Sequence, residues 1–339
     1  MVVSEDPLTV EIDGERRHAW ADTGLLGEMH EGDEVVVNVA ALDLGLGSGG
    51  FDVIHVNLTR GLDGGGAGSE HVMKLNYTSL QHPVEPIERP AGEADAGSSI
   101  PVLVLPLHGH LAPAAWAAAQ AAPGLRLGYI QTGGGALPGS LSRDVAELRE
   151  RNLLCGHITA SPAYGGEHEA LSVPGALDAA AHRLRWEAIV AGPGPGIIGS
   201  ATHLGHGGMT TLDTAHAALA LGMPTLLSPR LSEVDPRSRH RGISHHTLTV
   251  LQMLLGPVEV PVPEGNPVVA AQLAEATAGR HRFQEAPADL GGYEASGLPA
   301  QTMGRGINED GLFFAAPLAA GQVLGASSAG VVGGGGSRT

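Results

Sequence analysis

The 339-residue chain is poor in several residue types, and each scarcity excludes a class of protein. Cys155 is the only cysteine, which excludes an intrachain disulfide and a cysteine-based zinc site. Lysine occurs once, at Lys74, and the net charge of −17 argues against nucleic acid or an anionic membrane as the main partner. Aromatic residues make up 3% of the chain, so aliphatic and alanine contacts must form most of the core.

Targeting and membrane signals are also lacking. The first seven residues, MVVSEDP, contain neither a basic region nor an apolar core, so no signal peptide is predicted. We find no run that approaches the roughly 18 to 20 apolar residues that span a bilayer. The expected protein is therefore cytoplasmic and has no membrane partner, while homo-oligomer formation stays open.

Residues 1–82 are predicted to form a small antiparallel β-barrel-like domain. The segments 8–12 and 16–20 flank Asp13-Gly14, a dipeptide typical of a tight hairpin turn. Further β-branched or alternating runs occupy 34–40, 51–58 and 71–76. We expect residues 63–69 to be a flexible loop and the proline-rich residues 83–100 to be a linker.

Residues 101–280 are predicted to form a Rossmann-like α/β domain, in which a parallel sheet carries helices on both faces. Short apolar runs alternate with helical segments, as buried parallel strands do; the runs are 102–107, 125–131, 153–159, 188–191, 224–228 and 258–263. Ser142, Ser172, Ser244 and Asn266 stand where helix N-caps are expected. Residues 281–322 are predicted to be a loop and one helix that pack on this domain, and residues 323–339 a disordered tail.

The loops that follow the predicted strands are the unusual part of the chain. They contain, in chain order, His108, the triplet Gly133 to Gly135, the segment 164–169, a glycine loop at 192–208 and an arginine-rich loop at 230–246. Open α/β sheets bind ligands at the carboxyl ends of their strands. We therefore expect the functional site at this carboxyl edge.

The glycine loop contains GPGIIG at 194–199, which formally matches the G-x-G-x-x-G pattern of dinucleotide-binding proteins. No helix opens on it, it follows the fourth predicted strand, and no acidic residue lies about 20 positions further on. A glycine- and proline-rich turn is therefore favoured over a dinucleotide site. A looser cradle for phosphate or carboxylate stays open, formed by the backbone N–H groups of Gly133, Gly134, Gly135, Gly194 and Gly196.

The arginine-rich loop 230–246 holds four arginines of a strongly acidic chain and leads into a capped helix. Arginine makes bidentate contacts with phosphate and carboxylate. The alternative is a solvated loop that neutralises part of the protein's own acidic excess. We favour anion binding by Arg239 and Arg241, together with Arg305.

The chain has 17 histidines, and imidazole titrates near neutral pH. We expect His108, His245 and His246 to move protons in catalysis. No metal ligand is predicted, because no H-E-x-x-H spacing occurs, and the sequence indicates no particular cofactor. A histidine and carboxylate metal site is nonetheless feasible; its further candidates are His110, His203, His206, Asp213 and Asp235.

Several long strings resemble a bacterial family of domains of unknown function, the one catalogued as 3866. They include LDLGLGSGG at 42–50, HVMKLNY at 71–77, GGEHEA at 165–170 and RHRGISHH at 239–246. The similarity extends from Gly32 to about Gly321. It implies that the segment through Phe314 belongs to the fold, and it implies no activity.

The favoured hypothesis is an enzyme, a hydrolase or group transferase, that binds a small anionic metabolite of phosphorylated or nucleotide-like chemistry. The alternative is a non-catalytic module that senses a metabolite or mediates assembly. A third hypothesis is a metal-dependent hydrolase.

Overall fold

The computed structural model describes residues 1–46, 49–61, 72–90 and 98–333, with side chains described up to Ser328. The chain divides into two compact units, Met1–Pro86 and Ile87–Thr339. Residues 87–89 of the predicted linker belong to the second unit, because Ile87 is buried in its core and Arg89 forms an ion pair of 2.7 Å with Asp178.

The first unit is a curled mixed sheet with the strand order β1-β2-β3-β5-β4. The turn between β2 and β3 has φ of 51° at Asp13 and 82° at Gly14, the left-handed conformation that a two-residue hairpin requires. The predicted barrel-like domain is confirmed, with one difference, since β3 pairs with β5 in parallel. The strands are β1 (Val2–Glu5), β2 (Leu8–Ile12), β3 (Glu15–Trp20), β4 (Val35–Asn38) and β5 (Asp52–Asn57).

A small apolar core holds this sheet together, formed by Val2, Val10, Ala21, Leu26, Met29 and Ile54. Two one-turn helices, α1 (Thr23–Leu26) and α2 (Ala40–Asp43), and a two-stranded ladder, β6 (Met73–Lys74) with β7 (His82–Pro83), complete the unit. The predicted flexible loop at 63–69 lies outside the described residues.

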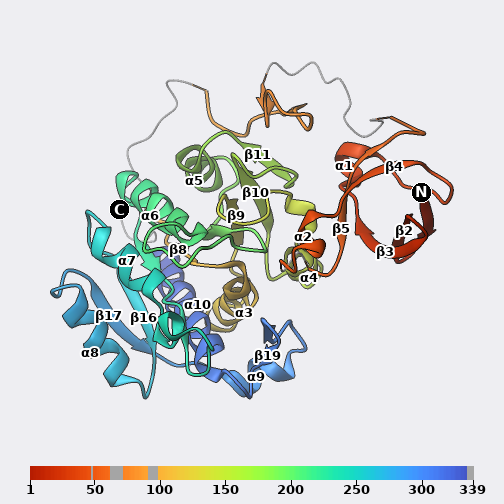
Figure 1. Cartoon of the computed structure of the whole chain (residues 1–339). Coiled ribbons are helices and arrows are strands. Elements are labelled where there is room, and N and C mark those ends of the chain that lie inside the picture. Colours follow the sequence, from red (N-terminus) through yellow and green to blue (C-terminus); the bar gives the residue numbers. More distant parts are fainter. Residues whose placement is uncertain (47–48, 62–71, 91–97, 334–339) are drawn as a thin grey trace. The chain divides into compact units, whose positions relative to one another are not determined.

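Eight parallel strands form the sheet of the second unit, in the order β11-β10-β9-β12-β8-β13-β16-β17, which confirms the predicted α/β class (Figure 1). All of their carboxyl ends therefore meet at one edge. The strands are β8 (Val102–Val104), β9 (Leu127–Thr132), β10 (Gly156–Ala160), β11 (His168–Ala170), β12 (Ala188–Pro193), β13 (Thr225–Leu227), β16 (Glu259–Pro263) and β17 (Arg282–Ala286). The edge strands β11 and β17 carry polar residues instead of an apolar run, so the sequence did not predict them. The expectation that only a loop and a helix follow residue 280 is wrong.

Helices cover both faces of this sheet, as predicted (Figure 1). One face carries α3 (Leu111–Ala121), α4 (Arg143–Glu150), α9 (Leu290–Ala295) and α10 (Gly311–Gly333). The other carries α5 (Val173–His182), α6 (Thr210–Ala220), α7 (His245–Met253) and α8 (Pro267–Ala276). Ser142, Ser172 and Ser244 accept backbone N–H bonds as N-caps, which confirms those predictions. Asn266 occupies the N-cap position of α8, as predicted, but its side chain makes no cap hydrogen bond, and its amide donates to the carbonyls of Pro263 and Glu264.

The last helix, α10, runs from Gly311 to Gly333, so the predicted disordered tail is wrong for residues 323–333. Residues 334–339 lie outside the described part of the chain. Its stretch Gly311–Ser328 is long and apolar enough to cross a membrane, which the sequence analysis overlooked. Of this stretch, 72% is buried inside the protein, as in the core helix of a globular unit.

The contact between α10 and α3 depends on small residues. A Cβ atom added at Gly321 would overlap the carbonyl oxygen of Ala114, and one added at Gly325 would lie 2.6 Å from that of Ala118. The two backbones therefore approach each other at the glycines, which is how a core with few aromatic residues reaches a high packing density.

We predict that Gly321→Ala destabilises the second unit by about 1–3 kcal/mol, because the added methyl overpacks this contact. Gly311→Ala on the same helix is the control, since its Cβ would lie 3.5 Å from the Leu290 side chain, an ordinary contact. Urea unfolding of both variants measures the difference. Equal free energies of unfolding for the two variants would contradict the close approach.

Candidate functional site

The loops after β9 and β12 pack directly against each other at the carboxyl edge. The N–H of Ala136 donates to the carbonyl of Pro195 at 2.6 Å. A Cβ at Gly135 would overlap the carbonyl of Gly194, and one at Gly194 would overlap the carbonyl of Ala136. Both glycines, predicted to cradle an anion, are thus required by the contact between the loops.

The other three predicted glycines lie in the same pair of loops. Gly133 packs against the ring of Pro162, and Gly134 has φ of 95°, a conformation that favours glycine. Gly196 has φ of 67° and has no atom within 4 Å of its Cβ position among the described residues. The structure brings all five glycines together, and it accounts for at least three of them by backbone geometry or packing.

The glycine loop then closes on itself and delivers a histidine to the edge. Gly199 pairs with His206 in an antiparallel bridge, and the N–H of Gly207 donates to the carbonyl of Ile198 at 2.6 Å. A short 3-10 turn, η3 (Gly207–Met209), follows and leads directly into α6. His206 therefore lies at the beginning of this helical segment.

The arginine-rich loop positions two further histidines through the Ser244 cap. The Ser244 hydroxyl accepts the N–H of His246 at 3.2 Å and forms a 2.8 Å hydrogen bond with Nδ1 of His240. This cap begins α7 and places His245 and His246 in its first turn.

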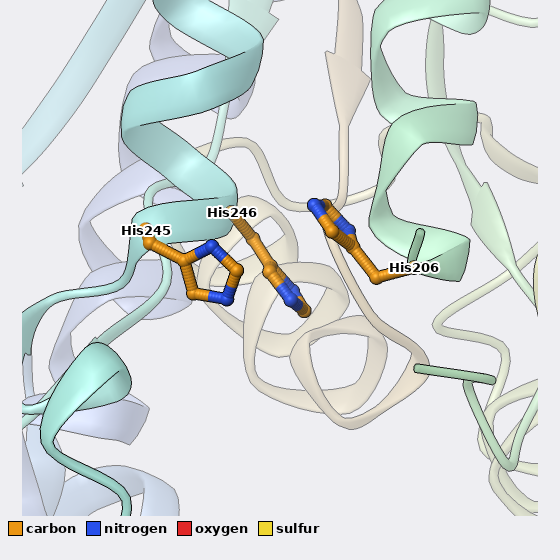
Figure 2. A group of neighbouring side chains, drawn as sticks. All are labelled: His206, His245 and His246. Carbon is orange, nitrogen blue, oxygen red and sulfur yellow. The ribbon is translucent and has the colours of Figure 1, made fainter. Parts of the chain in front are cut away.

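His206, His245 and His246 form a compact histidine cluster (Figure 2). The rings of His206 and His246 are stacked, with centroids 3.6 Å apart and planes within 7°. The ring of His245 lies 4.4 Å from that of His246, at an angle of 67°. One ring nitrogen from each histidine lies within 4.8 Å of the other two.

Two of the three histidines are buried, His245 is partly buried, and the cluster makes few hydrogen bonds. His206 is 7% exposed and His246 is 6% exposed. Among the described residues, neither ring nitrogen of His206, nor Nδ1 of His246, nor Nε2 of His245 makes a hydrogen bond of ordinary geometry, although the His203 carbonyl lies near the His206 ring. Buried polar atoms without partners are costly, so the arrangement requires an explanation.

Burial holds the histidine cluster in its neutral form. Desolvation lowers the pKa of His206 and of His245, and it lowers the pKa of His246 to about 2. Repulsion from neighbouring imidazoles and from Arg230 also lowers the pKa of each, and for His206 the repelling imidazole is that of His203. The backbone of His203 raises the pKa of His206, but desolvation outweighs it. Neutral imidazoles with free lone pairs accept protons or bind metal ions.

A buried ionic group holds the base of the arginine-rich loop. Asp235 is 0% exposed and lies 2.9 Å from Arg237, 3.3 Å from Arg230 and 3.6 Å from Arg305. Arg305 also lies 3.2 Å from Asp310, a fully buried carboxylate. Burial raises the pKa of Asp235, but the hydrogen bonds and charge of Arg237 outweigh it and lower the pKa below its usual range.

The three predicted anion-binding arginines therefore differ in environment. Arg305 is engaged by two carboxylates, and Arg241 donates to the backbone carbonyl of Asp235 at 3.3 Å. Arg239 is exposed and makes no hydrogen bond or ion pair with the described residues. It directly precedes His240, whose ring lies 5.1 Å from that of His245, and its charge lowers the pKa of His245.

His108 belongs to a different polar group from His245 and His246. Its Nε2 lies 2.7 Å from the Ser142 hydroxyl, and its Nδ1 lies 3.4 Å from the Tyr129 hydroxyl. His110 turns to the Ser228 hydroxyl, 3.0 Å away, so the paired histidines of 108 and 110 do not share a ligand position. Burial lowers the pKa of both.

The sequence analysis named His206 only as a further imidazole, and the structure makes it a member of the principal cluster. Its partners lie far along the chain, in the next loop of the sheet. The sequence indicated only that both loops lie at the carboxyl edge of the same sheet, one after β12 and one after β13. It did not indicate which side chains of the two loops contact each other.

The comparisons with known proteins match the chain to one family. A family model described as "Protein of unknown function (DUF3866)" matches residues 18–321. The chain belongs to this family. The match confirms the resemblance drawn from the sequence strings, and it covers parts of both units. No curated protein and no solved structure matches the chain. A function for this chain is therefore inferred from the residues at the carboxyl edge.

We predict that the protein loses stability as the pH falls below about 6.5, the usual histidine value. The folded pKa values of the histidine cluster are lowered, so the unfolded state binds more protons below that pH. The neutral histidines contribute their full share of the free energy of unfolding when the pH is above the unfolded-state pKa. This contribution is lost as the pH falls, by up to about 1.4 kcal/mol per pH unit for each histidine. Urea unfolding in metal-free buffer between about pH 8 and 5 measures this slope.

His246→Gln removes one such group and should flatten the pH dependence. His182→Gln on α5, away from the carboxyl edge, should keep the slope of the unsubstituted protein. If His246→Gln and the unsubstituted protein lose stability in parallel, His246 is not a neutral buried group.

We predict that Asp235→Asn destabilises the second unit by about 3–5 kcal/mol, because it leaves buried guanidinium charge uncompensated. The exposed carboxylate of Asp213 on α6 is the control, and Asp213→Asn should cost less than about 1 kcal/mol. Guanidinium chloride unfolding measures both. A cost for Asp235→Asn as small as that of the control would show that the ionic group does not hold the loop.

Proposed function

We propose that this protein binds a small anionic metabolite, phosphorylated or nucleotide-like, at the carboxyl edge of its parallel sheet, and that it hydrolyses the metabolite or transfers a group from it. The observation that carries the proposal is that the exposed Arg239 directly precedes His240, whose ring lies 5.1 Å from that of the partly buried His245. A guanidinium can hold an anionic group there while an adjacent imidazole accepts a proton.

The local charge supports an anionic ligand. The buried ionic group contains the guanidiniums of Arg230, Arg237 and Arg305 and the carboxylates of Asp235 and Asp310. Three positive and two negative charges leave an excess of one positive charge. Arg239 and Arg241 add two positive charges, and Glu233 and Glu309, which lie beside the same group, add two negative ones. In a chain with a net charge of −17, a segment that keeps an excess positive charge is a favourable place for an anion.

His245 is the best-placed of the three predicted proton carriers. It is only partly buried, whereas His246 and His108 are 6% and 8% exposed. In the proposed reaction, neutral His245 takes the proton of an attacking water or hydroxyl group as its oxygen bonds to the phosphorus, and Arg239 and Arg241 hold the charge of the group under attack. The phosphorus–oxygen bond to the leaving group breaks, and the proton on His245 passes to the departing oxygen. A base of this kind is available at neutral pH because desolvation lowers the pKa of His245.

We predict that Arg239→Gln combined with Arg241→Gln weakens binding of inorganic phosphate and pyrophosphate at least about tenfold, since charge-assisted hydrogen bonds contribute about 1.5–3 kcal/mol each. Isothermal titration calorimetry gives the affinity, and the rise in melting temperature with added anion gives a second measure.

Arg282→Gln is the matched control, because Arg282 is exposed at the amino-terminal end of β17, remote from the carboxyl edge. Unchanged anion affinity in the double variant would place the anion elsewhere or exclude it. Binding of pyrophosphate without its hydrolysis would favour the non-catalytic sensing module over an enzyme.

A further inference from the structure

The proposed function uses only His245 of the histidine cluster and leaves the other two buried imidazoles without a role. We propose that His206, His245 and His246 together bind one divalent transition-metal ion of the zinc class. The site requires no anion to be bound, so it goes beyond the function proposed above. When the ion is bound, His245 is a ligand and its lone pair no longer accepts a proton; a water molecule in the open coordination position would then supply the nucleophile in place of one activated by His245.

The convergence of the three side chains is the first support. One nitrogen of each ring lies within 4.8 Å of the other two. Three nitrogens bound to one zinc ion at about 2.0–2.1 Å in tetrahedral geometry lie about 3.3 Å apart. The rings therefore need to close by at most about 1.5 Å, a displacement that side-chain rotation supplies.

The stacked pair must open when the ion binds. The planes of His206 and His246 lie within 7° and the ring centroids 3.6 Å apart, so the in-plane lone pairs lie in two nearly parallel planes and cannot both point at one ion. Rotation of one imidazole turns its lone pair toward the other. The rotation breaks few hydrogen bonds, because Nδ1 of His246 makes none with the described residues and the ring of His206 has only the nearby His203 carbonyl.

Gly208 leaves space beside the two stacked rings. A Cβ added there would lie 2.9 Å from Nδ1 of His206 and 3.2 Å from Nδ1 of His246. The two nitrogens thus face one position, which glycine alone keeps free. The φ of Gly208 is not positive, so the backbone itself would accept another residue. We attribute the glycine at this position to the need for free space next to the two Nδ1 atoms, where the ion would bind.

The donor set selects the class of ion. Three neutral imidazoles suit zinc, cobalt, nickel or copper, whereas magnesium and calcium require oxygen ligands. A site with three protein ligands keeps a coordination position open for water or substrate. The remaining histidine of the group, His240, is held by the Ser244 hydroxyl and is not counted as a ligand.

The surrounding charges determine what takes the open position. Arg230 is buried near the cluster and Arg239 is exposed beside it, and both repel a cation. Asp235, 3.3 Å from Arg230, offsets part of this charge. The remaining positive potential favours an anionic fourth ligand, such as hydroxide or phosphate. Zinc and phosphate should therefore strengthen each other's binding.

The test is titration of the full-length, chelator-treated protein with Zn²⁺ by isothermal calorimetry, and with Co²⁺ by visible absorption. We expect one ion per chain and a cobalt spectrum of a four-coordinate nitrogen site. His206→Gln and His246→Gln should each weaken zinc binding at least about a hundredfold, because loss of a ligand costs more than the roughly 10–100-fold that loss of a residue supporting a ligand costs. His182→Gln on α5 should bind zinc as the unsubstituted protein does.

Gly208→Ala keeps all three ligands and fills the space between the nitrogens, so it should also lose the ion. It guards against misfolding of the histidine variants, and circular dichroism and the melting temperature of each variant show whether it is folded. Absence of a one-to-one complex with either ion in the unsubstituted protein, or undiminished binding in folded Gly208→Ala, overturns the site.

Titration with phosphate separates the metal site from the proposed function. Zinc binding that phosphate leaves unchanged supports the metal site and counts against the anion site. Phosphate binding in the chelator-treated protein, with no zinc complex, supports the anion site and overturns the metal site. Mutual strengthening supports both and favours the metal-dependent hydrolase.

Discussion

The fully buried carboxylate of Asp235 is the contact on which the geometry of the candidate site depends. It draws together Arg230 and Arg237, both in the arginine-rich loop, and Arg305, which lies shortly before α10. A charge taken out of water at this depth is stable only when it is paired and hydrogen-bonded. The loop is therefore held in one conformation, and the Ser244 cap that follows it directs the first turn of α7 to the edge of the sheet.

Desolvation then determines the chemistry of the residues in that turn. The rings of His206 and His246 are buried against each other, so their charged forms are disfavoured and they retain lone pairs at neutral pH. The guanidiniums nearby act in the same sense. Burial and the arginine charges disfavour protonation of the imidazoles, so their nitrogen atoms keep the lone pairs that a metal ion needs. The arginine charges also favour an anion next to the ion.

Much of the fold was predictable because its signals are local. A serine at an N-cap, an Asp-Gly hairpin turn and a buried apolar strand each act over a few residues, and the serine caps at 142, 172 and 244 were predicted correctly. The errors have a common cause. Strand β17 is recruited to the sheet edge by backbone pairing with β16, and α10 continues to Gly333 because α3 and the sheet cover it. Neither effect is visible in a window of sequence.

The candidate site shows the same division. The amino-acid sequence was sufficient to locate the carboxyl edge, the glycine and arginine loops and the excess of histidine, since parallel strands bring their ends together whatever the loops contain. Only the tertiary structure showed that Gly135 and Gly194 serve the packing of two loops, that Arg305 is neutralised while Arg239 is exposed, and that His206 stacks on His246. Which side chains meet across two loops depends on how those loops pack, and that packing is a property of the whole second unit.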